Sequence, residues 1–416
     1  MSGIEISIIL LITLMLLLGN LRIHRDITAP AVLLSAVWMF VELFSFISAP
    51  HYFFSFYALA WIQILLLLFS GGAALAKKTV QNSTSENTSF KWVIRLQLLC
   101  LLATPFATLS MIRDSGMGFP SSTGEFIELS QRLTAGRYSG EHLSMLTMGF
   151  LTLTYIGCLN GGMLAVKSEK LIVRIFSIAI LPLLLGFTVV YTARATFLFG
   201  FLFFVSSFLM SLAGKGNINA KLLTPKYLRW IVVSSISILL IFMSTQLLRS
   251  GDGSVGMDKL KAVSNHLKVW FSGNLSGYSY WFDLEAGEES HKAGMSIAGL
   301  VELSGGGTRK PGIYQVAYDA SLHQEWTNIF TLFRYLMDDL GTIGTLLFLA
   351  LLGWISTALY QRVKEESLVA IGLLSGIIAA LLFSFVTSIM AYNTVLFAWV
   401  GFSIFLSLQE KANAKA

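Results

Sequence analysis

The sequence predicts an all-α polytopic membrane protein with about 11 transmembrane helices. Of its 416 residues, 55% are hydrophobic and 12% are charged, and that charged share is about half of what soluble globular proteins carry. Continuous apolar runs of about 20 residues, long enough to cross a bilayer as helices, recur along the chain. A single soluble core needs no such runs, and the strands of a membrane β-barrel alternate instead. Both of these architectures are therefore disfavoured.

The apolar runs give the expected positions of the spans. They cover residues 3–21, 31–49, 53–75, 92–110, 143–166, 172–191, 194–212, 229–248, 340–360, 367–387 and 389–407. The first run has no basic segment before it and no small-x-small cleavage site, so we interpret it as a retained span rather than a signal peptide. Residues 1–416 then form a single transmembrane domain.

Basic residues are concentrated in alternate loops, which predicts the orientation of the chain. Five loops and the C-terminal tail are all basic: about 22–26, 77–91, 167–174, 215–229, 361–366 and 409–416. The short loops between them contain a single basic residue, Arg194. Because Lys and Arg favour the cytoplasmic side, we expect the C-terminus inside and the N-terminus outside. The net charge of +6 then reflects topology and does not indicate a nucleic-acid partner.

Two long loops, at about 111–142 and 249–339, fall on the outer side, the second between spans 8 and 9. The cytoplasmic loops are too short for a nucleotide-binding domain, and no Walker pattern occurs. Cys100 and Cys158 lie inside predicted spans, where buried thiols without function are the favoured interpretation. No CxxC or HxxxH spacing supports a metal site, and we expect no cofactor.

The outer loops contain helical patterns. Ser122 and Glu125 have the spacing of a capping box ahead of an amphipathic segment. Apolar residues of 257–271 recur at helical spacing between lysines, which predicts a helix on the membrane surface. The mixture of Gly, Ser, Asn and aromatic residues in 272–283 predicts a turn-rich segment. That segment suits either stacking on sugar rings or a place in the interfacial aromatic belt.

Arginines near the outer ends of the spans are the main candidates for a binding site. Arg194 is the strongest because it departs from the charge bias of the short loops, and Arg249, Arg309 and Arg334 accompany it. A snorkelling anchor or a structural ion pair is the alternative for each of them, and for Arg113. One guanidinium group donates two parallel N–H···O hydrogen bonds to a phosphate, and it stays charged. Arginines at this depth therefore suit the diphosphate of a polyprenyl lipid and the negative charge that develops when it leaves.

Other polar residues of the second outer loop suit glycosyl transfer. His323 and Glu325 are candidates for the base that takes a proton from an acceptor hydroxyl, although an ordinary loop histidine is the alternative for His323. Tyr314 and Asn328, with Thr327, are able to hydrogen-bond to sugar hydroxyls.

Three acidic residues near or inside the spans call for partners. Asp338 is a further candidate for substrate binding, although Asp338 and Asp339 also suit an ion pair with Arg334 or a cap on the next helix. Glu42 lies inside the second span, so we expect it to pair with an Arg or a polar residue on another span. Gln63 is one such candidate.

The segment "TNIFTLFRYLMDDLGTIGTLLFLALLG" resembles the signature of Wzy-type O-antigen polymerases, also called oligosaccharide repeat-unit polymerases. The matching positions are Thr327, Asn328, Thr331, Arg334, Asp339, Gly341 and Gly344. The stretch "YTARATFLFGFLFF" is similar to the family's Arg-bearing helix start and matches at Arg194. The stretch "HLKVWFSGNLSGYSYWFD" is similar to its Gly/aromatic segment. The resemblance covers about 190–345.

This resemblance implies a GT-C-like glycosyltransferase in the bacterial inner membrane, with a periplasmic N-terminus and a cytoplasmic C-terminus. The implied reaction joins undecaprenyl-diphosphate-linked oligosaccharide repeat units into O-antigen polysaccharide, and undecaprenyl diphosphate leaves. Membrane lipids and a polysaccharide chain-length regulator are the further partners it suggests. An O-antigen ligase and a flippase or exporter of lipid-linked oligosaccharides are the alternatives. Charges at the outer edge, a long outer loop and the absence of a repeat favour an enzyme over a transporter.

Overall fold

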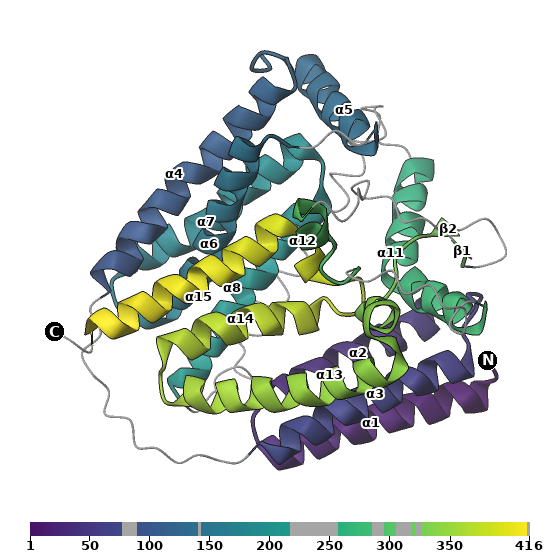
Figure 1. Cartoon of the computed structure of the whole chain (residues 1–416). Helices are drawn as coiled ribbons and strands as arrows, with labels where there is room; N and C mark the ends of the chain where they lie inside the picture. Colours follow the sequence, from purple (N-terminus) through teal and green to yellow (C-terminus); the bar gives the residue numbers. More distant parts are fainter. Residues whose placement is uncertain are drawn as a thin grey trace.

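The computed structural model describes residues 1–76, 90–139, 143–216, 257–284, 295–304, 318–320 and 326–413. This part of the chain is an all-α bundle, and nine of its helices are long and apolar enough to cross a membrane (Figure 1). These are α1 (Gly3–His24), α2 (Pro30–Ser48), α3 (Phe56–Leu75), α4 (Lys91–Asp114), α6 (Met145–Lys167), α7 (Leu171–Tyr191), α8 (Arg194–Gly214), α13 (Leu332–Lys364) and α15 (Asn393–Asn413). The prediction of an all-α polytopic membrane protein is confirmed.

The remaining elements are shorter or less apolar. They are α5 (Thr123–Ser139), α11 (Met257–Leu284), α12 (Ala298–Leu303), α14 (Leu368–Leu382), the 3₁₀ turn η1 (Ile389–Ala391) and the antiparallel strands β1 (Tyr318–Asp319) and β2 (Trp326–Thr327). Serine N-caps begin several helices because a side-chain oxygen accepts a first-turn N–H that has no partner within the helix. The capping serines are Ser2, Ser55, Ser144 and Ser367.

Ten of the eleven predicted spans coincide with observed helices, and the run at 229–248 lies outside the described residues. Two boundaries were wrong. The run at 367–387 stays helical only to Leu382, and a non-helical segment follows. The second outer loop does not extend to 339, because α13 already begins at Leu332. Gly341 (φ 64°, ψ −178°) divides α13 into a short first part and a long second part. Glycine adopts such a conformation without the steric cost of a Cβ.

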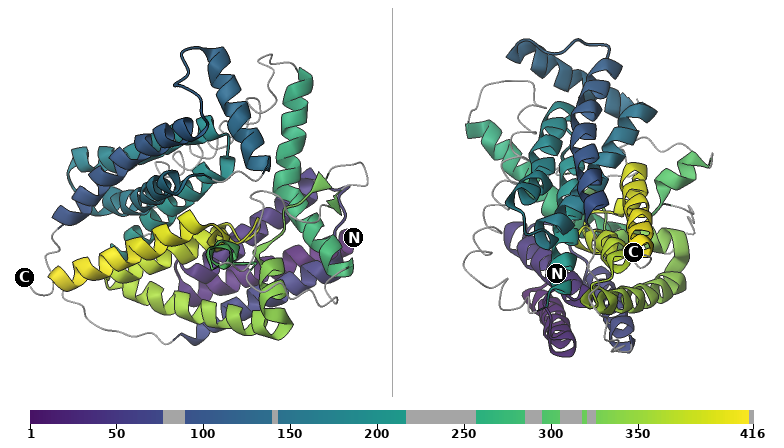
Figure 2. Two further views of the ribbon diagram at one scale, coloured as in Figure 1. Left: turned by 45° about the horizontal axis from the view of Figure 1, so that its top comes forward. Right: turned by 90° about the vertical axis from the view of Figure 1, so that its left-hand side faces the viewer.

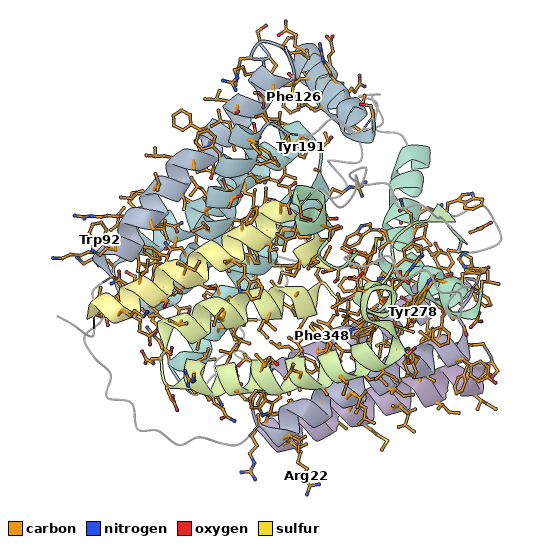
Figure 3. All side chains as sticks on the ribbon, viewed as in Figure 1. Arg22, Trp92, Phe126, Tyr191, Tyr278 and Phe348 are labelled. Atoms are coloured by element: carbon orange, nitrogen blue, oxygen red, sulfur yellow. The ribbon has the colours of Figure 1, made fainter. Side chains whose placement is uncertain are left out.

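The helices form two groups joined by α14. Helices α1, α2 and α3 lie with α13, whereas α4, α6, α7 and α8 lie with α15, and α14 contacts members of both groups (Figures 1 and 2). Large apolar side chains cover the outside of the bundle, including Leu11, Met15 and Phe348. They face the position of the lipid in a membrane protein. Arg22 and Trp92 lie toward one end of the bundle, and Tyr191 and Tyr278 toward the other (Figure 3).

Contacts between loops support the predicted alternation of sides. The Lys364 ammonium lies 2.9 Å from the Asp26 carboxylate, and Lys167 lies 2.8 Å from Glu366. All four residues belong to loops that the charge pattern placed on the same side. Burial alone would raise the pKa of Asp26, but hydrogen bonds from Tyr360, Lys364 and Thr28 outweigh burial and hold this pKa below its usual value. The carboxylate thus joins the α1–α2 loop to the end of α13.

Two glycines allow α3 and α13 to approach closely. A Cβ at Gly72 would lie 1.9 Å from the carbonyl oxygen of Ala350, and a Cβ at Gly353 would lie 2.0 Å from that of Phe69. Membrane helices associate through such close backbone approach because lipid provides no hydrophobic drive between them.

We expect Gly72→Val to destabilise the protein by about 1–3 kcal/mol or more, since the added methyl groups force the two helices apart. The midpoint of thermal unfolding in detergent measures this loss. Gly71→Val is the matched control, because nothing lies within 4 Å of a Cβ at the neighbouring position. Equal losses in the two variants would contradict the close approach.

The predicted outer-loop helices both occur. At the start of α5 the Ser122 hydroxyl accepts the Glu125 N–H at 3.2 Å, and the Glu125 carboxylate accepts the Ser121 N–H at 2.6 Å. The predicted cap is therefore present, with its second bond displaced by one residue. Helices α5 and α11 stand across the direction of the spans, at the end of the bundle away from the C-terminus (Figure 2).

The predicted turn-rich character of 272–283 was wrong. Helix α11 continues without a break to Leu284, and Leu275, Tyr278 and Trp281 on it are buried in the bundle. Gly273 and Gly277, four residues apart, form a face on which Thr327 packs, with a Cβ at either position about 3 Å from it. The small and polar residues of this stretch are thus the contact face of a helix. This half of α11 does not lie on the membrane surface.

Candidate functional site

A non-helical segment between α14 and α15, residues 383–392, lies inside the bundle; we call it the α14–α15 linker. It includes the short η1 turn, and its residues Phe383, Ser384 and Thr387 are buried. The indole N–H of Trp38, near the middle of α2, donates to the Ser384 hydroxyl at 3.0 Å. Irregular backbone at this depth must have its polar groups bonded within the protein or to water. The linker is therefore the region where irregular backbone replaces continuous helix inside the bundle.

Helices from distant parts of the chain donate hydrogen bonds to backbone carbonyl groups of the linker. The Leu332 N–H, at the start of α13, donates to the Ser384 carbonyl at 2.7 Å. The side-chain amide of Asn274 on α11 donates to the Phe385 carbonyl, also at 2.7 Å. The linker thus joins α11 and α13 to the end of α14.

Arg334 lies in the first turn of α13, beside this junction. Its guanidinium carbon lies 3.8 Å from the centre of the Phe330 ring and 5.3 Å from that of Trp281, and its Nε lies 3.6 Å from the Asp338 carboxylate. The side chain is 13% exposed. When a guanidinium stacks on an aromatic face, its N–H donors lie in its own plane and point away from the ring. The predicted ion pair of Asp338 with Arg334 is confirmed.

The residue before Arg334 is packed inside the bundle. The preceding residue, Phe333, stacks on Trp38 with ring centres 5.0 Å apart, and Trp38 lies near the middle of α2. The first part of α13 therefore enters the bundle before the chain bends at Gly341. A charge is retained at such a position only for a reason, because its desolvation is costly.

Arg194 is the first residue of α8 and is 8% exposed. Before it, Thr192 has a left-handed conformation (φ 52°, ψ 22°), which turns the chain sharply between α7 and α8. No side chain caps this helix start and its first turn contains no acidic residue. The partial positive charge of the helix N-terminus therefore adds to that of the guanidinium, and both favour an anion.

The two helices that carry these arginines meet the same linker. Phe199, little more than one turn beyond Arg194, lies 5.2 Å from Phe383 and 4.7 Å from Tyr392 between ring centres. Phe383 and Tyr392 are the two ends of the linker, whose Ser384 accepts the N–H at the start of α13. Arg194 and Arg334 thus belong to two helices that both contact the linker.

Asp339 has a role that the sequence did not reveal. Its carboxylate accepts the backbone N–H groups of Met295 and Ser296 at 2.6 and 2.7 Å, together with the Ser296 hydroxyl. The Ser296 carbonyl in turn accepts the Ser388 hydroxyl at 2.8 Å. Asp339 therefore binds the segment before α12 to α13 and to the linker. The segment that this carboxylate holds is 43 residues away in sequence, so the local pattern, which suggested an ion pair or a cap on the next helix, did not indicate this contact.

We expect Asp339→Asn to release the α12 segment, because an amide cannot accept two N–H donors and a hydroxyl as a carboxylate does. Limited proteolysis of the purified protein should then cleave near residues 295–304 about tenfold faster, which corresponds to a loss of about 1.4 kcal/mol. Ser403→Ala provides a comparison, since that hydroxyl donates to the Trp399 carbonyl within its own helix. Unchanged cleavage in Asp339→Asn would show that the hydrogen bonds of Asp339 do not hold the α12 segment in place.

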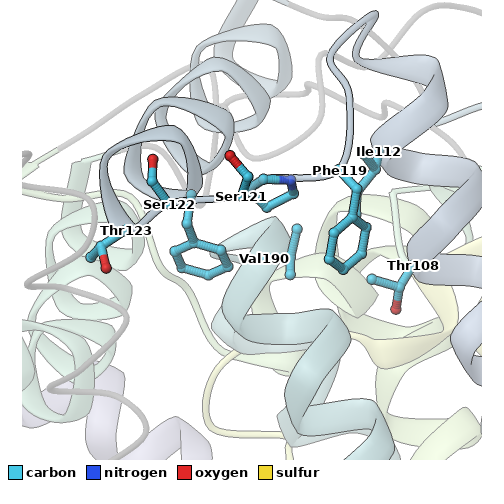
Figure 4. A pocket seen from close by; sticks show the side chains of 9 residues that line it. Thr108, Ile112, Phe119, Ser121, Ser122, Thr123 and Val190 are labelled. Carbon is cyan, nitrogen blue, oxygen red and sulfur yellow. The ribbon is translucent and has the colours of Figure 1, made fainter.

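Two cavities lie at the α4–α5–α7 end of the bundle. One, of about 540 Å³, is lined mainly by apolar and hydroxyl side chains, among them Thr108, Ile112, Phe119 and Val190 (Figure 4). The other, of about 530 Å³, lies beneath α5 and is more polar. Neither is lined by Arg194 or Arg334.

The second cavity adjoins the turn before Arg194. Its lining includes Asp114, Arg132 and Tyr191, and the hydroxyl of Thr134 on α5 is hydrogen-bonded to that of Thr192. No pattern in the sequence singled out Asp114, Arg132 or Tyr191. Arg113 itself is 68% exposed and pairs with Asp114 at 3.3 Å, as an anchoring ion pair would.

The other predicted site residues have mixed outcomes. Asn328 is half-buried beside Thr327, whose hydroxyl accepts the Ile329 N–H at 3.3 Å. Five candidates lie outside the described residues: Arg249, Arg309, Tyr314, His323 and Glu325. Cys100 and Cys158 are buried free thiols. Among the described residues, no group of three or more His, Cys, Asp or Glu side chains is placed to hold a metal ion.

Comparison with known proteins gives no relative: no family model, no curated protein and no solved structure matches the chain.

Proposed function

We propose that this chain is a membrane glycosyltransferase of the O-antigen polymerase type. In this proposal it joins undecaprenyl-diphosphate-linked oligosaccharide repeat units at the periplasmic face of the bacterial inner membrane. The growing chain is transferred from its lipid diphosphate onto a hydroxyl of the incoming lipid-linked unit. The bond between the anomeric carbon and the diphosphate oxygen breaks, the acceptor oxygen forms the new bond, and undecaprenyl diphosphate leaves. The acceptor proton passes to a base, for which His323 and Glu325 are the candidates.

The observation that carries this proposal is the position of Arg334. It is mostly buried between Phe330 and Trp281, paired with Asp338, at a junction of irregular backbone inside a helical membrane bundle. Guanidinium groups hold phosphate oxygens in pairs, and a site of low dielectric strengthens that interaction. Donors fixed in place before the reaction stabilise the charge that develops on a leaving diphosphate.

Arg194 supplies a second positive centre, on a helix whose Phe199 contacts the linker. Its place at the uncapped start of α8 supports an anion there, because the helix dipole and the side chain act together. The resemblance around "YTARATF" and "TNIFT…R…DDLG" assigns the same two arginines. The polar cavity with Asp114, Arg132 and Tyr191 is a suitable place for sugar units next to that site, since carboxylate, guanidinium and aromatic groups together bind sugar hydroxyls and ring faces.

The test is an assay of the purified protein with lipid-linked repeat units as the only substrate. A ladder of products on a gel, each longer by one unit, is the expected result. Transfer that requires a lipid A core acceptor would instead indicate a ligase. Movement of the lipid-linked sugar across vesicles without chain extension would indicate a flippase or exporter. Either outcome would replace the polymerase assignment.

A further inference from the structure

Three polar side chains form a closed ring where α1, α2 and α3 meet, away from the arginines. The Thr13 hydroxyl oxygen lies 2.6 Å from one carboxyl oxygen of Glu42 and 3.0 Å from the Gln63 amide oxygen. The Gln63 amide nitrogen lies 2.6 Å from the other carboxyl oxygen of Glu42. Thr13 and Glu42 are fully buried and Gln63 nearly so. The predicted pairing of Glu42 with Gln63 is confirmed, and Thr13 is the additional member.

A count of protons shows what state the ring requires. Each of its three contacts needs one hydrogen. The Thr13 hydroxyl supplies one and the Gln63 amide supplies the one directed at Glu42. If Glu42 were ionised, two oxygens in the ring would face each other without a proton. If Glu42 is the neutral acid, it donates to Thr13, Thr13 donates to Gln63, and Gln63 donates back to Glu42.

The orientation of the amide does not change this result. If the oxygen and nitrogen of Gln63 are exchanged, the amide oxygen lies at 2.6 Å from a Glu42 oxygen, and that contact needs a proton on the carboxyl group. The ring then runs in the opposite direction, from Glu42 to Gln63 to Thr13 and back. Thr13 also lies 3.1 Å from the Ile9 carbonyl, and a hydroxyl hydrogen directed there leaves even fewer protons for the ring.

No opposite charge replaces the proton. Glu42 takes part in no ion pair of the described residues, and α2 and α3 contain no other charged residue. The ionisable groups of α1 are Glu5 at its start and Arg22 and His24 in its last turn, two or more turns from Thr13. Helix α14 has none.

Helices α11 and α13 also pack against α2, and their charged groups near this end have other partners. Asp283 accepts the Ser55 hydroxyl, Arg334 pairs with Asp338, and Asp339 binds the segment before α12. An ionised carboxylate in this position would therefore be buried among neutral groups, which is costly in a membrane.

We propose that Glu42 is a proton-binding site inside the membrane bundle, and that its proton attaches α1 to α2 and α3. Only Ile9, Thr13 and Asn20 of α1 are buried, so two of the three α1 side chains that the bundle encloses are polar. Asn20, seven residues along the same face, donates to Ser35 and Ser70 at 2.9 Å. Since lipid is as apolar as the helix, such polar contacts hold α1 in place.

The proposal makes stability depend on pH in a defined direction. The folded state holds a proton that an exposed glutamate would release at neutral pH, so the folded state binds more protons than the unfolded one. Stability therefore falls as pH rises above about 4.3, the pKa of an exposed glutamate, and it continues to fall until Glu42 itself loses its proton in the folded state. The Asn20 contact contains no titratable group and is expected to contribute equally at every pH.

The test compares wild type with Glu42→Gln, because glutamine has the donor and acceptor pattern of the neutral acid. The infrared band of a protonated carboxyl group should be present in wild type and absent from Glu42→Gln. Glu42→Gln should unfold at the wild-type temperature at about pH 4, and it should be the more stable of the two proteins at neutral and alkaline pH. Asn20→Leu should lower the unfolding temperature equally at all pH values. Identical carboxyl bands in wild type and Glu42→Gln, or the same dependence of unfolding temperature on pH in both, would overturn the proposal.

Discussion

Arg334→Lys is expected to reduce chain extension by about 10²-fold or more, the effect of removing one oriented donor from developing negative charge. Lysine keeps the charge but loses the planar group that stacks between Phe330 and Trp281 and presents paired N–H donors. The rate of ladder formation from purified lipid-linked units measures the loss, and growth of long polysaccharide in cells gives a second measure.

The control for Arg334→Lys has to separate chemistry from folding. Asp338 is an ion-pair partner of Arg334, and the shorter ammonium side chain of the variant would still be able to pair with it. The protein level and the unfolding temperature should therefore stay close to wild type. Wild-type ladder lengths with Arg334→Lys would remove this residue from the site. A loss of folded protein in parallel with activity would assign it a structural role instead.

Span positions were predictable from sequence, whereas the break in α14 was not. An apolar run of about 20 residues has to cross the membrane as a helix, and ten such runs did coincide with helices. The run at 367–387 is equally apolar, yet its last residues leave the helix because Asn274 and the Leu332 N–H satisfy the free backbone groups. Those partners are more than 50 residues away in sequence, so no local pattern contains them.

The same reason explains which parts of the site were missed. A charge among apolar residues can be recognised locally, and that singled out Glu42, Arg194 and Arg334. The partners of a charged residue depend on tertiary packing, which a local pattern does not contain. Thr13 contacts Glu42, Trp281 contacts Arg334, and the α12 segment contacts Asp339. The mistake over 272–283 has a related origin, because glycine and serine are typical of turns in soluble proteins but also of close helix contacts in membranes.

Arg194→Lys is expected to lower chain extension by about 10²-fold as well, because a point charge replaces paired donors at the uncapped start of α8. Its matched control is Arg113→Lys, which changes the same side chain at an exposed ion pair at the outer end of α4 and should retain wild-type ladders. Equal losses in these two variants would show that the effect is not specific to the site.

The double variant Arg194→Lys/Arg334→Lys tests whether both residues hold the same diphosphate. Independent residues far apart would give losses that multiply, whereas residues that act on one group give a combined loss well short of that product. We expect the second behaviour, because the helices of both arginines contact the α14–α15 linker. Losses that multiply fully would mean that the two guanidiniums serve separate ligands, and the assignment of one diphosphate site to this junction would fail.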